Sequence, residues 1–127
     1  MPSYAQLTAV AALSVLLSLS ATAHDERPDH FSGKTVTTEA EARSYFSQYN
    51  QKLATLLALP ELSPEQLLEI HEITYTLENA LKKLPTEAAS VADLLESLHL
   101  ASEYANAAEA KKHGEQYLQA VAALAGK

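Results

Sequence analysis

Several residue types are absent or scarce in this chain of 127 residues. Cysteine is missing altogether, which excludes disulfide bonds, thiolate metal ligands and a cysteine nucleophile. Glycine occurs only 3 times and aromatic residues make up 6% of the sequence, whereas alanine, leucine, glutamate and glutamine are plentiful. Such a composition, rich in helix-forming residues, predicts an all-α protein, and the length is enough for one domain.

Long basic runs are also missing. The 9 basic residues are scattered among 16 acidic ones, which gives a formal net charge of −7. Phosphate backbones and anionic lipids repel such a surface, so we expect no nucleic-acid partner. The sequence also lacks a G-x-S-x-G turn and a glycine-rich phosphate loop, and its carboxylates form no defined pair. We therefore expect no enzymatic activity.

The first 23 residues contain no charged side chain and include a short apolar run from Leu7 to Leu19. Ala21-Thr22-Ala23 places small residues where a signal peptidase cleaves. Because the run is too short for a comfortable transmembrane helix, residues 1–23 are predicted to be a signal peptide rather than an N-terminal core helix. We expect an exported, periplasmic protein that has no stable membrane insertion after cleavage.

Two segments follow the predicted cleavage point. Residues 24–37 have no periodic pattern and contain Pro28 and Gly33, so they are predicted to form an extended or flexible arm. Residues 38–127 are predicted to form a helical bundle domain. Its first helix begins at Thr38, which forms a capping box with Glu41, and runs to about Leu59.

Proline and further capping residues mark the other helices. Ser63, Pro64 and Gln66 predict the start of the second helix, and Pro85 ends it. The third helix is expected from Thr86 or Ser90 to about residue 105, and residues 106–109 resemble the start of a fourth.

The boundary between the third and fourth helices contains neither proline nor glycine, so one continuous helix over residues 86–125 is the alternative. That helix would be about 60 Å long, more than its partners can cover. We therefore predict a bend at Asn106 and an antiparallel up-down-up-down four-helix bundle.

The second predicted helix carries an apolar stripe with a polar line beside it. The stripe has the 3-4 spacing of one helix face and consists of Leu67, Ile70, Thr74, Leu77, Leu81 and Leu84. His71, Tyr75 and Glu78 lie about one turn apart beside it. Tyr75 and Glu78 are candidates for an interaction face.

Three histidines are candidates for a metal site in the middle of the bundle. His71 and His99 are equally far from Pro85, and His113 falls at nearly the same height if the chain bends at Asn106. Glu96 precedes His99 in an E-x-x-H pattern, and Glu103 follows it by one turn. Imidazole and carboxylate are ordinary ligands of zinc, copper and iron.

The same residues have a structural interpretation. Each histidine lies beside an apolar stripe, where polar groups often border a core, and an isolated E-x-x-H is common in glutamate-rich helices. Two hypotheses about function follow. The first is a non-catalytic binding or scaffolding module that meets another periplasmic protein through the second and third helices. The alternative is a carrier of Zn²⁺, Cu²⁺ or haem. The sequence does not fix the oligomeric state.

Three blocks, DERPDHFSGK, HEITYTLENAL and LHLASE, resemble those of a small family of secreted proteobacterial proteins of unknown function. The resemblance covers essentially the whole mature chain and implies an exported, mostly helical protein without an assigned activity. In length and helix pattern the chain is also similar to cytochrome b562, which holds haem through a methionine and a histidine. The ligand pattern differs, because the single methionine here is Met1 and the first helix offers Tyr45 and Tyr49.

Overall fold

The computed structural model describes residues 32–125, and all regular structure in this range is helical. It comprises α1 (Glu39–Leu57), α2 (Pro64–Leu81), a 3₁₀-helix η1 (Thr86–Val91), α3 (Ala92–Glu103) and α4 (Ala107–Ala125). The predicted all-α four-helix fold is confirmed. The predicted signal peptide and residues 24–31 of the predicted arm lie outside the described residues.

Capping residues fix the starts of α1 and α2 as the sequence predicts. The Thr38 hydroxyl accepts from the Glu41 backbone N–H at 3.1 Å, and the Glu41 carboxylate accepts from the Thr38 N–H at 3.2 Å. Ser63 and Gln66 form the same reciprocal pair at α2, with Pro64 as the first helical residue. Two N–H groups that lack helical acceptors are thus satisfied at each start.

The second helix ends earlier than the sequence suggests. It stops at Leu81 instead of continuing to Pro85, and Thr86–Val91 form a 3₁₀-helix before α3 begins at Ala92. Proline disfavours the α-conformation in the residue before it, so the helix closes ahead of Leu84. The first turn after Pro85 has no side-chain cap, and a tighter 3₁₀ turn takes its place.

The predicted bend between the third and fourth helices is present, which excludes the alternative of one continuous helix. Ala105 adopts a left-handed conformation with φ 51°, and the Asn106 N–H donates to the Ala101 carbonyl at 2.9 Å. The Asn106 side chain then accepts from the Glu109 N–H at 3.2 Å at the start of α4. The chain thus ends α3 with a left-handed residue and starts α4 with a side-chain cap.

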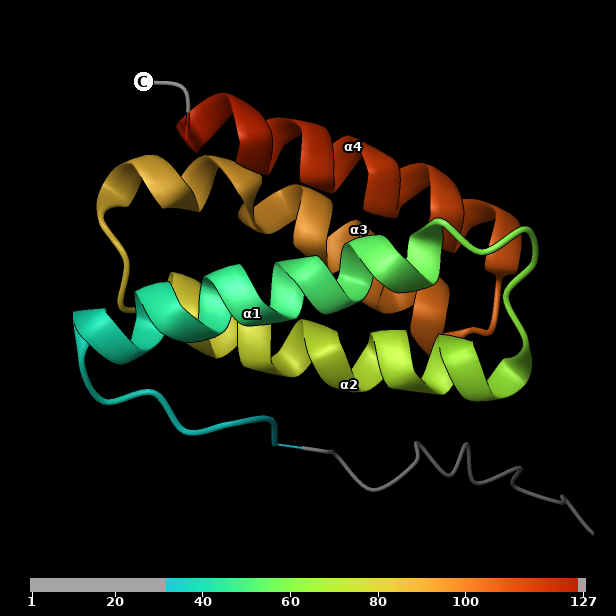
Figure 1. Cartoon of the computed structure of the whole chain (residues 1–127), viewed down its shortest axis with the longest axis horizontal. Coiled ribbons are helices and arrows are strands. Elements are labelled where there is room, and N and C mark those ends of the chain that lie inside the picture. Colours follow the sequence, from blue (N-terminus) through green and yellow to red (C-terminus); the bar gives the residue numbers. More distant parts are fainter. Residues whose placement is uncertain (1–31, 126–127) are drawn as a thin grey trace, which may run out of the picture.

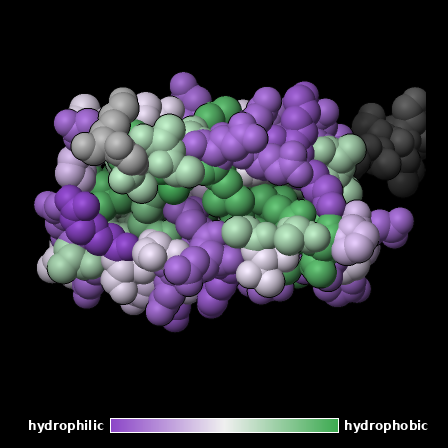
Figure 2. All heavy atoms as spheres, turned by 45° about the horizontal axis from the view of Figure 1, so that its top comes forward, coloured by the Kyte–Doolittle hydropathy of each residue, from purple (hydrophilic) through white to green (hydrophobic). Residues whose placement is uncertain are grey.

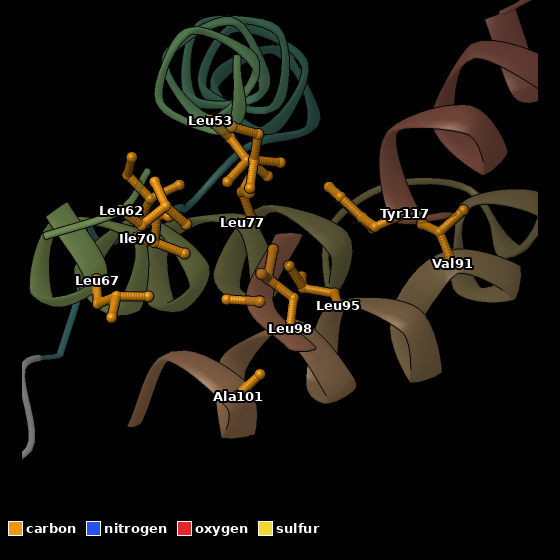
Figure 3. Close-up of a cluster of buried hydrophobic side chains, with 13 residues drawn as sticks. Leu53, Leu62, Leu67, Ile70, Leu77, Val91, Leu95, Leu98, Ala101 and Tyr117 are labelled. Carbon is orange, nitrogen blue, oxygen red and sulfur yellow. The ribbon is translucent and has the colours of Figure 1, made fainter. Parts of the chain in front are cut away.

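Consecutive helices pack side by side and are joined at neighbouring ends, so the chain reverses direction at each connection (Figure 1). Their inner faces form one apolar core, in which Leu53 of α1 and Leu77 of α2 point toward each other (Figure 3). The buried members of this core are Leu53, Leu57, Leu62, Leu67, Ile70, Ile73, Leu77, Val91, Leu95, Leu98, Ala101, Ala110 and Tyr117. On α2 the predicted stripe is buried from Leu67 to Leu77, whereas Leu81 and Leu84 are half-buried.

The described part of the arm, residues 32–37, lies against α2. The Lys34 N–H donates to the Thr76 hydroxyl at 3.0 Å, and the Asn79 amide donates to the Ser32 and Lys34 carbonyls at 3.0 and 3.1 Å. Gly33 has φ +68°, and a Cβ there would lie 2.8 Å from the Thr76 nitrogen. Only glycine allows the arm to approach the helix this closely.

Helices α1 and α4 approach each other closely at one end and less so at the other. At the close end a Cβ on Gly114 would overlap the side chain of Leu57, and the Lys111 ammonium donates to the carbonyls of Leu59 and Pro60. Toward the start of α1 and the end of α4, Val121 and Leu124 are only half-buried. Within residues 32–125, no helix is both long and apolar enough to cross a membrane.

Candidate functional site

The polar line on α2 meets the corresponding side of α3. The ring centroids of His71 and His99 lie 4.7 Å apart, and Tyr75 makes edge-on contacts with both, at 5.0 and 4.8 Å. His71 and His99 are only 7% and 8% exposed, and Tyr75 is half-buried. The sequence prediction that His71 and His99 lie close together is correct, because one short connection places them at the same height.

Thr74 holds His99 in one orientation. Its hydroxyl donates to the His71 carbonyl at 2.6 Å and lies 2.7 Å from His99 Nδ1. Since a hydroxyl has one proton and that proton is used on the carbonyl, the hydroxyl accepts from His99 Nδ1–H. The neutral His99 therefore has its lone pair on Nε2, which faces the Glu103 carboxylate at 3.8 Å.

Two ionisable groups of this cluster have buried polar atoms without hydrogen bonds. Glu78 Oε1 is 3.5 Å from His99 Nδ1 and makes no hydrogen bond among the described residues. Burial raises the pKa of Glu78, against the lowering effect of His99. Burial, together with the neighbouring His99, lowers the pKa of His71, whose Nδ1 is also buried without a partner in the described chain. Both groups are thus shifted toward their neutral forms.

The other predicted ligands lie elsewhere. His113 Nε2 contacts Glu109 at 3.0 Å and faces a shallow depression between α3 and α4, on the side of Tyr104. Glu96 is exposed and borders a different depression, near Lys82. Among residues 32–125 no three histidine or carboxylate side chains gather where they could hold one ion. The predicted three-histidine layer is therefore wrong for His113, because equal height along a bundle does not place side chains on the same face.

A second site, which the sequence analysis did not identify, is an apolar groove between the open ends of α1 and α4. It has a volume of about 590 Å³. Figure 2 shows a hollowed band of hydrophobic surface bordered by hydrophilic side chains on the side where these helices face each other. Its apolar walls come from α1, the segment after α2 and α4, and consist of Phe46, Leu84, Pro85, Ala88, Val121 and Leu124.

Asn50 lines this groove and is 8% exposed. Its amide nitrogen and oxygen have no hydrogen-bond partner among the described residues, and the same holds for the hydroxyl of the fully buried Tyr117. Burial raises the pKa of Tyr117, and the Asn50 side chain lies close enough to that hydroxyl for a hydrogen-bonding interaction that acts in the opposite direction. Three buried polar atoms at one place are costly unless something satisfies them.

A sequence signal for Asn50 existed. A 4-3-4 spacing places Phe46, Asn50, Leu53 and Leu57 on one face of α1, so the asparagine takes an inward position in an otherwise apolar series. What the spacing did not reveal is that α4 leaves this position next to a groove. The wider separation of α1 and α4 at this end, compared with their close approach at Gly114, decides that.

The fold and these two sites define a small all-α bundle with a buried histidine pair and an open apolar groove. The chain belongs to DUF6746, a family of unknown function whose sequence model matches residues 1–126. This confirms the resemblance to an uncharacterised family. No curated protein and no solved structure matches the chain.

Proposed function

We propose that this protein is an exported, non-catalytic binding module that holds an apolar ligand in the groove between α1 and α4. The groove carries the proposal: half-buried apolar side chains of both helices line a hollow of about 590 Å³. Small-molecule sites usually have this size and are mostly apolar with a few polar groups. Export and a periplasmic location rest on the predicted signal peptide in residues 1–23.

The histidine cluster supports a non-catalytic function. His71 and His99 are buried in the interface of α2 and α3, and Thr74 occupies the Nδ1 atom of His99. A general acid or base has to reach its substrate directly or through one water molecule. The cluster is better suited to holding two helices together than to proton transfer with a ligand.

The metal or haem carrier has less support than the binding module. A structural zinc site uses four ligands and a catalytic one uses three, while the described structure brings together only His71 and His99 of the predicted histidines.

Tyr75 and Glu78 stay predicted as a contact surface for a second periplasmic protein. The groove lies on other helices, so a ligand there and a protein at this face would not compete.

Binding of pyrene, a hydrocarbon whose fluorescence reports the polarity around it, tests the groove. We expect the purified protein to move pyrene into an apolar environment at one site per chain. Val121→Asp places a carboxylate on the groove wall and should weaken this binding at least tenfold. Leu68→Asp is the matched control, because Leu68 is 54% exposed on α2 and belongs to neither groove wall. Equal binding by both variants, or no binding by the unmodified protein, would refute the groove as the binding site.

A further inference from the structure

The polar atoms beside the groove indicate what kind of molecule it takes. Asn50 and Tyr117 contribute one amide nitrogen, one amide oxygen and one hydroxyl. None of them makes a hydrogen bond of standard geometry within residues 32–125, although the two side chains lie close enough to interact. The amide offers donors as well as an acceptor, so its natural complement is a group that also does both. Because Asn50 lines the groove while its polar atoms are closed to solvent, a ligand group that reaches them would replace hydrogen bonds lost on folding.

The surroundings of Asn50 also indicate the charge of that ligand group. The groove contains two charged side chains, Arg43 and Glu87, and both are exposed. Arg43 is already paired with Glu39 at 2.5 Å. At Asn50 the neighbours are instead apolar side chains and the buried Tyr117 ring. An ion placed there would lose its hydration without gaining an opposite charge, which costs far more than burying a neutral polar group.

We propose that the groove binds a neutral amphipathic small molecule, with its apolar body along Phe46, Val121 and Leu124 and its carboxamide-like or hydroxyl head group hydrogen-bonded to Asn50. This inference rests on the proposed function, since it specifies the ligand of the same groove. The Asn50 side chain turns toward the head group, and the Tyr117 hydroxyl provides a second partner.

Competition against bound pyrene distinguishes a neutral from a charged head group. Decanamide and decanoate have the same alkyl chain, but only decanoate is charged at pH 7. We expect decanamide to displace pyrene at least tenfold more effectively. Displacement by decanoate that is equal or better would place the head group at Arg43 on the rim and overturn the proposal.

Asn50→Leu tests the head-group contact separately from the groove. Leucine keeps the size of the side chain and removes the unpartnered amide, so the variant should fold and melt no lower than the original protein. We expect the ratio of its affinity for decanamide to its affinity for pyrene to fall about 3- to 10-fold, as for the loss of one hydrogen bond.

The Asn50 side-chain amide signals in a ¹⁵N NMR spectrum of the unmodified protein give a direct readout. They should shift on addition of decanamide and not on addition of pyrene. If Asn50→Leu binds decanamide as tightly as the original protein, or if these signals do not move, the Asn50 amide takes no part in ligand binding and the inference fails. Pyrene binding that persists in that case would leave the proposed groove intact, whereas loss of all binding would refute both.

Discussion

At the scale of single residues, the most informative feature is the pair of buried histidines between α2 and α3. His71 stacks against His99 with centroids 4.7 Å apart, and both are covered by Tyr75. Two imidazoles this close cannot both be charged without repelling each other. Protonation of His71 is therefore unfavourable in the folded bundle, which links the α2–α3 interface to pH.

This link predicts how stability changes with pH. Burial and the neighbouring His99 lower the pKa of His71 from its ordinary value of 6.5, with Glu103 and Glu72 acting in the opposite direction. Above about pH 6.5 His71 is neutral in both the folded and the unfolded chain, so the shift has no effect. As pH falls from 6.5 toward the lower pKa of the folded state, only the unfolded chain takes up the proton, and stability decreases.

Urea unfolding at pH 7.5 and pH 5.5 measures this contribution. The protein should lose stability between the two values, and His71→Phe, which keeps a ring between Tyr75 and His99, should lose less. Glu78 acts in the reverse sense, because burial raises its pKa above 4.5 and protonation near that pH relieves a buried charge. An identical loss in His71→Phe and the unmodified protein would mean that other groups set the acid sensitivity.

At the scale of elements, local interactions determine some helix ends and tertiary contacts determine others. Thr38 with Glu41 and Ser63 with Gln66 start α1 and α2 by interactions within four residues, so these starts need no help from the core. The end of α3 is different. Ala105 takes a left-handed conformation that costs an L-residue roughly 1–2 kcal/mol, and no glycine is present there to relieve it. The bend thus persists because packing of α4 against α3 requires it.

A substitution at Ala105 tests this account of the bend. Ala105→Gly removes the steric cost of φ 51° and should raise stability by about 0.5–1 kcal/mol, after allowance for the greater freedom of glycine in the unfolded chain. Ala108→Gly, on the exposed side of the first turn of α4, should instead lower it by about 1 kcal/mol. Thermal melts of both variants give the comparison, and the same sign of change in both would contradict the left-handed strain.

At the scale of the whole molecule, the bundle has one main core, a small second apolar cluster and one incompletely closed seam. Leu77 is fully buried near the middle of that core, opposite Leu53 (Figure 3). The groove between α1 and α4 leaves the far end of the same core partly uncovered. Ligand binding and stability are therefore coupled, because a molecule that fills the groove of the folded state alone stabilises it by mass action.

The centre of the core should be far more sensitive to truncation than the surface. Leu77→Ala removes a fully buried side chain and is expected to cost about 2–5 kcal/mol. Glu87→Ala changes an exposed side chain and should have almost no effect. Urea unfolding of the two variants provides the measurement, and small, similar losses would show that the core is not centred on α2.

The sequence by itself determined the helical class, the starts of α1 and α2 and most buried positions of the stripe on α2. These depend on capping, proline geometry and the helical period, which act within a few residues. The closeness of His71 and His99 was also predictable, because one short connection between α2 and α3 fixes their positions along the bundle axis.

Only the tertiary structure decided toward which side of the bundle the side chains at one height point. His113 on α4 faces Glu109 and the depression near Tyr104 instead of joining His71 and His99. The rotation of α4 about its axis decides this, and that rotation follows from packing against α3. The groove beside Asn50 likewise arises because α1 and α4 pack tightly at Gly114 and less closely toward the end of α4. No local pattern encodes the separation of helices far apart in the chain, because it is set by how side chains fit across the whole bundle.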